Sequence, residues 1–166
     1  MTIPSSPILI AGGGIGGLAA AITLRRVGFD ALVFERAAEP AEVGAGISLW
    51  PNATRQLRRW GVLDDVMRSG FVFRGGVIRN PAGAELSRIS TGEHDAPSIL
   101  IHRAALHSAL LAQLPAWTVF GGAALQGFVD DGAGVRARFA GLGEVEGAAL
   151  IGADGLRSTV RRILLD

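Results

Sequence analysis

The chain has 166 residues, of which 49% are hydrophobic and 19% are charged, and this balance excludes intrinsic disorder. Its net charge of +1 gives no support to nucleic-acid binding, and its 24 glycines indicate special backbone geometry. Cysteine and lysine are absent, which excludes disulfides, thiolate nucleophiles, cysteine-bound metals and lysine Schiff bases. We predict a cytoplasmic protein, since nothing in the sequence needs an oxidising compartment.

The first apolar stretch could be mistaken for a membrane span, because no charged residue occurs from Thr2 to Leu24. Several glycines interrupt it, and each weakens a helix. No basic segment precedes the stretch, as a signal peptide would require. We therefore expect no membrane association, and divide the stretch into a strand, a glycine turn and a helix.

The first 35 residues predict a β-α-β unit. Pro7–Ala11 is a short apolar run typical of a buried strand, and Asp30–Glu35 has the same character. Between them, Ile15–Val27 has apolar residues at helical spacing, with Gly28 as a C-terminal stop. Such a unit has a right-handed crossover and parallel strands.

The rest of the chain predicts more helices and strands. Asn52 is the expected N-cap of a helix that reaches Gly61. The other expected helices are Leu63–Arg68, Arg103–Leu114 and Leu156–Leu165. The expected strands are Phe71–Ile78, Glu85–Ile89, Trp117–Phe120, Gln126–Val129, Val135–Phe139, Val145–Ala149 and Leu150–Ala153.

Gly12, Gly14 and Gly17 form the pattern G-x-G-x-x-G between the first strand and the first helix. The first glycine allows a tight turn, the second lets the backbone approach a pyrophosphate, and the third lets the helix pack on the strand. The helix N-terminus then faces the phosphates. We predict cofactor contacts at these glycines and at Ile15 and Gly16.

Glu35 supports this interpretation, because it lies 23 residues after Gly12 at the end of the second strand. A carboxylate there accepts hydrogen bonds from a ribose diol and repels a 2′-phosphate, whereas Arg36 would suit a 2′-phosphate. The pattern indicates a dinucleotide and leaves FAD and NAD(P) open. The alternative is a glycine turn and a strand-end acid that bind no ligand.

Three ordered segments resemble the FAD-dependent aromatic hydroxylases of the para-hydroxybenzoate and salicylate hydroxylase type. They are GAGISLWPNATRQLRRWG at 44–61, Arg103 in R-x-x-L-x-x-x-L, and GADGLRSTVR at 152–161. The resemblance covers only the N-terminal portion of that family. It implies FAD as cofactor, NADH or NADPH as transient reductant, and hydroxylation of a small aromatic or heteroaromatic substrate with O2.

The resemblance also implies roles for individual residues. Arg103 would reach the FAD phosphates, and Asp154 and Gly155 would lie at the pyrophosphate region. Asp154 could instead be the N-cap of the closing helix. The glycine segment at 44–46 would run along the flavin ring edge, and the further cofactor contacts that we expect are Arg36, Gly46, Ile47 and Leu125.

The resemblance completes the predicted fold: an α/β, Rossmann-like FAD-binding fold with a parallel sheet, a small antiparallel meander and the start of a second, mixed-sheet substrate domain. We assign residues 1–70 to the FAD-binding βαβ unit and the following helices. Residues 71–101 would begin the substrate-domain sheet, and residues 102–166 would return to the FAD-binding domain. The family's C-terminal remainder is absent, so we expect the chain alone to be incomplete for turnover.

Some residues are assigned no chemistry. His94, His102 and His107 have no metal-ligand spacing, and Ser158 has no histidine partner for nucleophilic catalysis. The catalytic residues are therefore left unknown. Two other functions stay open: a stand-alone nucleotide-binding module, and a flavin oxidoreductase without oxygen insertion. Exposed apolar surface would favour self-association or association with the missing C-terminal portion.

Overall fold

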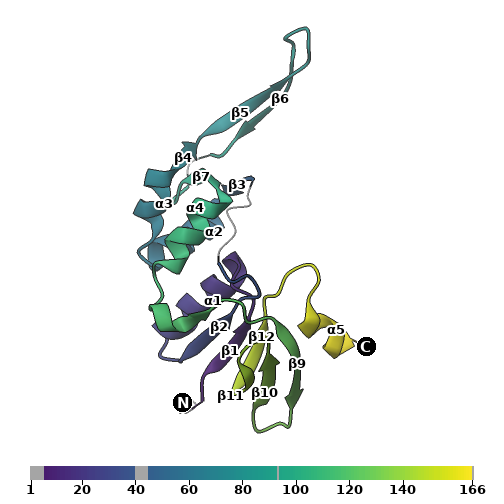
Figure 1. The fold of residues 1–166 in the computed structure, drawn as a ribbon. Coiled ribbons are helices and arrows are strands. Elements are labelled where there is room, and N and C mark those ends of the chain that lie inside the picture. The colour runs from purple at the N-terminus through teal and green to yellow at the C-terminus, as the bar shows by residue number, and fades with distance from the viewer. Residues whose placement is uncertain (1–5, 40–44, 93, 166) are drawn as a thin grey trace. The chain divides into compact units, whose positions relative to one another are not determined.

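The computed structural model describes residues 6–39, 45–92 and 94–165. The chain divides into two compact units (Figure 1). The first unit joins Met1–Glu42 to Leu110–Asp166, and the second unit is Val43–Ala109. The assignment of residues 71–101 to a substrate domain stays a prediction.

The first unit is built on a parallel four-stranded sheet in the order β12-β1-β2-β8. The predicted β-α-β unit is confirmed as β1 (Ile8–Ala11), α1 (Ile15–Arg26) and β2 (Ala31–Phe34). The strands β12 (Ala149–Gly152) and β8 (Val119–Phe120) pair in parallel with β1 and β2. The carboxyl ends of β1 and β12 therefore meet at one edge of the sheet.

The predicted antiparallel meander is also confirmed in this unit. Its strands are β9 (Leu125–Asp130), β10 (Val135–Phe139) and β11 (Gly143–Gly147), with β10 in the centre. The apolar side of β10 shares a core with β1 and β2, where the Phe34 and Phe139 rings stack 3.9 Å apart between centroids. This packing ties the meander to the parallel sheet.

The second unit contains a three-stranded sheet in the order β3-β7-β4. The strands are β3 (Gly46–Leu49), β7 (Ser98–His102) and β4 (Gly70–Phe73), and two helices, α2 (Pro51–Arg59) and α3 (Leu63–Ser69), belong to the same unit. The buried residues of this unit come mainly from these two helices and from β7: Thr54, Leu57, Leu63, Val66, Ile99 and Ile101.

A two-stranded hairpin, β5 (Gly75–Arg79) and β6 (Glu85–Ser90), also lies in the second unit (Figure 1). Every residue of β6 is exposed. The remaining helices are α4 (Arg103–Leu111), the 3-10 turn η1 (Ala116–Thr118) and α5 (Thr159–Leu165). No helix of the described segments has the length and apolar character needed to cross a bilayer.

The sheets of the second unit differ from the sequence prediction of a mixed sheet. All strand pairings described there are antiparallel. Of these pairs, only β5 and β6 are joined by a short turn, whereas β3 and β7 pair across a long stretch of chain, so their antiparallel pairing follows from the tertiary fold. The sequence also predicts one strand over Phe71–Ile78, but it is interrupted at Arg74, because Gly75 adopts a φ of +155° that a regular strand does not.

Several helix and strand boundaries also differ, among them β11, which lies at Gly143–Gly147 and not at 145–149. Pro51 is the first residue of α2 and Trp50 its N-cap, not Asn52, since proline suits the first helical position. The segment predicted as a strand from Trp117 begins with a 3-10 turn, in which Thr118 N–H donates to the Pro115 carbonyl at 2.9 Å. Two further helices are shorter than predicted: α4 ends at 111 and α5 begins at 159.

Candidate functional site

The glycine turn after β1 is fixed by close backbone contacts. Gly12 has a φ of +108°, and a Cβ added there would overlap the carbonyl of Ala153, just beyond β12. A Cβ added at Gly17 would overlap the carbonyl oxygen of Gly12. A side chain at Gly12 would push the turn away from the segment after β12, and a side chain at Gly17 would push α1 away from the turn. The first and third glycines of the motif are therefore required by packing.

The second glycine of the motif has a different environment. Among the described residues, nothing lies within 4 Å of a Cβ built at Gly14 or at Gly16. Gly14 is the N-cap of α1, and no described side chain caps this helix. Its first turn contains no acidic residue. The first N–H groups of α1 and the positive end of its dipole therefore lie beside open space, an arrangement that fits a phosphate.

Glu35 lies next to this turn and is held in place by the backbone. Its Oε2 accepts a hydrogen bond from Gly13 N–H at 2.7 Å, and its Oε1 accepts one from Ala37 N–H at 2.9 Å. A Cβ at Gly13 would lie 2.8 Å from that of Glu35, so the turn and the carboxylate are in contact. Arg36 is exposed. The structure therefore places the predicted ribose-binding carboxylate beside the predicted phosphate-binding turn.

An open cavity of about 540 Å³ lies at the edge of the sheet where β1 and β12 end. It brings Gly16 together with the segment that follows β12, including Asp154, Gly155, Ser158 and Arg161. The crevice at the carboxyl ends of parallel strands is the usual ligand site of such sheets. The first and the last predicted motifs of this unit thus share one cavity.

Asp154 accepts hydrogen bonds from the start of the closing helix, although the residue directly before α5 is Ser158, whose hydroxyl accepts one from Arg161 N–H at 2.9 Å. Its Oδ2 accepts hydrogen bonds from Thr159 N–H at 2.6 Å and from Val160 N–H at 3.2 Å. Its Oδ1 accepts one from the Ser158 hydroxyl at 2.6 Å. Burial acts to raise the pKa of this carboxyl, but these hydrogen bonds outweigh it, so the pKa lies below its ordinary value. The carboxylate is therefore charged and held in one orientation.

The other predicted contacts lie elsewhere in the chain. Arg103 begins α4 in the second unit, and its N–H donates to the Ala45 carbonyl at 3.1 Å. Gly46 and Ile47 are the first residues of β3, and Gly44 lies outside the described residues. Leu125 begins β9 and packs against the core of the first unit. The part of these residues in cofactor binding stays a prediction.

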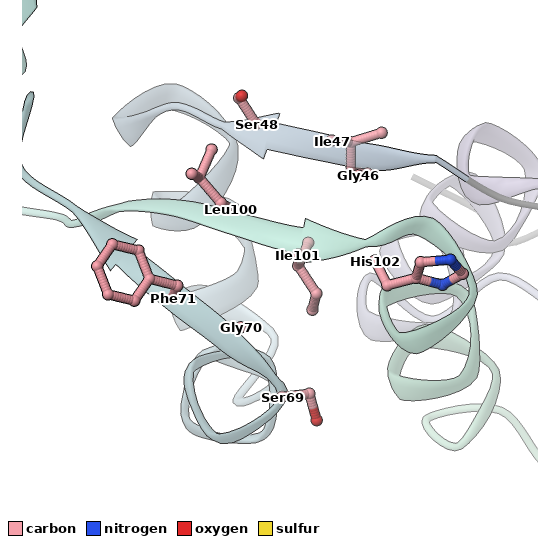
Figure 2. Close-up of a pocket in the computed structure, with 9 residues that line it drawn as sticks. All are labelled: Gly46, Ile47, Ser48, Ser69, Gly70, Phe71, Leu100, Ile101 and His102. Atoms are coloured by element: carbon pink, nitrogen blue, oxygen red, sulfur yellow. The ribbon is translucent and has the colours of Figure 1, made fainter. Parts of the chain in front are cut away.

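Sequence reasoning missed a second cavity, which is confined to the second unit. It measures about 550 Å³ and lies on the β3-β7-β4 sheet (Figure 2). Of its lining residues, only Gly46 and Ile47 were predicted as site residues; the others are Ser48, Ser69, Gly70, Phe71, Leu100, Ile101 and His102. The short apolar run at 98–101 is a strand signal that could have revealed β7. Across the described residues, no group of three acidic or histidine side chains could hold a metal ion.

Comparison with known proteins places this geometry in a family. The FAD binding domain family matches residues 5–164. Aurachin C monooxygenase/isomerase of Stigmatella aurantiaca is 43% identical over 162 residues, which cover 95% of this chain and 42% of that protein. A 3-hydroxybenzoate 6-hydroxylase of Polaromonas naphthalenivorans is 38% identical over 165 residues, covering 93% and 41%.

A solved structure also matches most of this chain. Klebsiella pneumoniae HpxO, crystallised with FAD and uric acid, superposes with a TM-score of 0.81 at 29% identity. The match covers 95% of this chain and 41% of that protein. The chain therefore spans about two fifths of the length of the relatives it matches.

Proposed function

The chain belongs to the FAD binding domain family, and from this membership we propose that it is the FAD-binding portion of a flavin-dependent monooxygenase that hydroxylates an aromatic or heteroaromatic substrate. NADH or NADPH would be the reductant and O2 the co-substrate. The relatives support this proposal, because one is named as a monooxygenase/isomerase of aurachin C and the other as a 6-hydroxylase of 3-hydroxybenzoate, which is an aromatic acid. The observation that carries it is the open N-terminus of α1 beside the anchored carboxylate of Glu35.

The residues of the glycine turn fit the dinucleotide in a simple way. The N–H groups at the start of α1 would donate to the pyrophosphate, and the empty space at Gly14 would admit it. The Glu35 carboxylate would accept hydrogen bonds from a ribose diol while its own position is fixed by Gly13 and Ala37. Because this carboxylate is negatively charged, it would also disfavour a cofactor with a 2′-phosphate.

Asp154 would act by positioning. Both of its oxygens accept hydrogen bonds from the segment 158–160, and a carboxylate that faced a phosphate directly would be repelled. By holding α5 and the turn before it, Asp154 would keep Gly155 at the rim of the cavity that also contains Gly16. When bound, FAD supplies the redox chemistry, while the protein binds, orients and shields the reacting groups.

Titration of the 166-residue chain with FAD tests the proposal, with flavin and tryptophan fluorescence as readouts and ATP and NAD as competitors. We expect saturable binding of FAD that either competitor displaces only at much higher concentration. Equal displacement by NAD would favour a general nucleotide-binding module. No binding by a folded sample, judged by circular dichroism, would contradict the proposal for this chain.

A matched pair of variants tests the role of the turn. Gly14→Val places a side chain in the open space at the start of α1, and we expect FAD affinity to fall by about tenfold or more, the equivalent of one or two lost hydrogen bonds to a charged group. Gly127→Val is the control, because nothing described lies within 4 Å of its Cβ either, and it sits on β9. If the two variants bound FAD with equal affinity, the phosphates of FAD would not lie at the start of α1.

A further inference from the structure

The β5-β6 hairpin of the second unit has no buried residue. All residues of β6 are exposed, and in β5 all are exposed except Gly76, which is half-buried. Among the described residues, no third strand pairs with either edge of this hairpin (Figure 1). A two-stranded hairpin by itself is only marginally stable in water, and a third strand or a packed face normally completes it. The exposure of this hairpin therefore indicates that another strand completes it.

The two edges of the hairpin differ in how they are protected against pairing. On β6, Arg88 Nη2 donates to Glu85 Oε2 at 2.7 Å, and Leu86 is an extra residue at a register shift. Charged side chains and bulges are the usual means by which an edge strand avoids pairing. From residue 75 to residue 78, β5 has no charged residue and no proline. The edge of β5 is therefore the one that is open to another strand.

Two backbone hydrogen bonds at the ends of the hairpin show which side the backbone groups of β5 face. They run from Asn80 N–H to the Ala84 carbonyl, at 2.9 Å, and from Thr91 N–H to the Arg74 carbonyl, at 3.3 Å. Backbone groups point alternately to the two sides of a strand, so the even-numbered residues of β5 face β6 and the odd-numbered residues face outward. The outward-facing residues are Gly75, Val77 and Arg79.

The edge of β5 is self-complementary when a second copy of the chain approaches it in the antiparallel direction. With a twofold axis at Val77, this valine lies opposite its own copy, and both face outward, as a hydrogen-bonded pair requires. Gly76 then lies opposite Ile78 of the other copy. Gly75 lies opposite Arg79, so no two like charges face each other. The net charge of +1 adds little repulsion between two copies.

The same register brings exposed apolar side chains together on one face of the hairpin. A Cβ at Gly76 would lie 3.6 Å from the Phe73 ring, so this ring packs against the backbone of Gly76. Ile89 pairs with Gly76 across the hairpin and is 45% exposed. Ile78 lies on the same face and is 53% exposed. In the antiparallel register, Ile78 of the second copy lies opposite Gly76, and it therefore packs beside Phe73 and Ile89.

We propose that the edge of β5 pairs with β5 of a second copy of this chain, in an antiparallel register centred on Val77. The two hairpins then form one four-stranded antiparallel sheet in the order β6-β5-β5-β6. Three or more strands with an apolar face are what a stable sheet requires. One strand pair buries little surface, so the dimer is weak and reversible. The inference goes beyond the proposed function, because this contact needs no cofactor.

Charged substitutions at the twofold axis test both the partner and the register. Val77→Glu and Val77→Arg each place two like charges opposite each other, so each variant alone should dimerise about tenfold more weakly than the parent chain. An equimolar mixture of the two variants places a glutamate opposite an arginine, and its dissociation constant should return to within about threefold of the parent value. Sedimentation velocity over a concentration series measures the dissociation constant, and circular dichroism checks that each variant is folded.

Two matched controls separate this register from a general effect of charge. Ile78→Glu and Ile78→Arg add the same charges one residue further along β5, where position 78 lies opposite position 76, so their mixture should recover less than the Val77 mixture. Val129→Glu adds the same charge on β9 of the first unit, where the valine is 58% exposed. This variant should dimerise as the parent chain does.

Amide hydrogen exchange of the parent chain gives a second test that needs no variant. As the protein concentration rises, exchange should slow most at the odd-numbered residues of β5 and least at Gly76 and Ile78, whose N–H groups face β6. A chain that stays monomeric at every concentration would overturn the inference, and so would a dimer that Val77→Glu does not weaken. Equal recovery by the Val77 and Ile78 mixtures, or slowed exchange on β6 alone, would overturn the proposed register and edge.

Discussion

The glycine turn of the first unit and the open face of the β3-β7-β4 sheet, which carries the second cavity, define open space in opposite ways. In the turn, the backbone leaves no room for a side chain at Gly12 and Gly17, and nothing described lies within 4 Å of a Cβ at Gly14 between them. On the sheet face, exposed side chains such as Phe71 and His102 define the surface. The first site therefore depends on positions that must lack a side chain, and the second depends on side chains that must be present.

The largest expected effect on stability comes from a substitution that disrupts the glycine turn. Gly17→Ala places a Cβ on the carbonyl oxygen of Gly12, and neither group can move without separating α1 from β1. We expect a loss of about 3 kcal/mol or more in the free energy of unfolding, or no folded protein. Urea denaturation followed by circular dichroism measures it.

Gly16→Ala is the matched control for this change. It adds the same methyl group one residue earlier, where nothing described lies within 4 Å. Alanine is a better helix former than glycine, so the free energy of unfolding should rise by about 0.5–1 kcal/mol. Similar destabilisation by both alanines would show that the contact with the Gly12 carbonyl is not the cause of the loss at Gly17.

This difference between the regions also decides what the sequence could predict. The β-α-β unit was predicted within one or two residues, because glycine, apolar runs and helical spacing are local signals. The roles of Gly12 and Gly17 followed from the motif. The sequence could not decide whether Asp154 contacts the cofactor or the closing helix. Its hydrogen bonds depend on where α5 begins, and the predicted start at Leu156 is three residues too early.

The open sheet face was not predicted, although the apolar run at 98–101 is a strand signal for β7. Ser48 and Leu100 are 52 residues apart in the chain and become neighbours only through the β3-β7 register. Both β3 and β7 were missed, since each is short and neither is joined to its neighbour by a tight hairpin turn. Strand pairing over such distances depends on the tertiary fold and leaves no local motif.

A moderate effect on stability is expected for Asp154, whose carboxylate holds the segment that lines the cavity at the end of β12. Asp154→Ala removes the carboxylate and leaves the N–H groups of Thr159 and Val160 at the start of α5 without this acceptor. We expect a loss of about 1–2 kcal/mol in the free energy of unfolding, measured by urea denaturation. Asp64→Ala on α3 is the control: its carboxylate is exposed, and the change should stay within about 0.5 kcal/mol. Equal losses would show that Asp154 does not support this helix.

A smaller effect follows from the charge of the same carboxyl. Because hydrogen bonds hold the pKa of Asp154 below its ordinary value in the folded chain, its stabilising contribution is complete above the unfolded pKa of about 4. The contribution is lost as the pH falls through the folded pKa. The difference in urea midpoint between the parent chain and Asp154→Asn should therefore be largest near neutral pH and shrink by about pH 3. If the difference in urea midpoint did not change with pH, ionisation of the Asp154 carboxyl would not be the source of the stabilisation.

The smallest effect on stability is expected in the second unit, on the β5-β6 hairpin. Leu86 is 65% exposed, so Leu86→Ala should change the free energy of unfolding by less than about 0.5 kcal/mol. Leu9→Ala makes the same chemical change at 0% exposure in the first unit and should cost about 2–5 kcal/mol. Exposed apolar groups on an unpaired hairpin promote association, so Leu86→Ala should instead lower self-association in sedimentation experiments. If Leu86→Ala destabilised the chain as much as Leu9→Ala, the hairpin would be packed in solution, and the contrast between a first unit specified by packing and a second specified by exposed side chains would not hold.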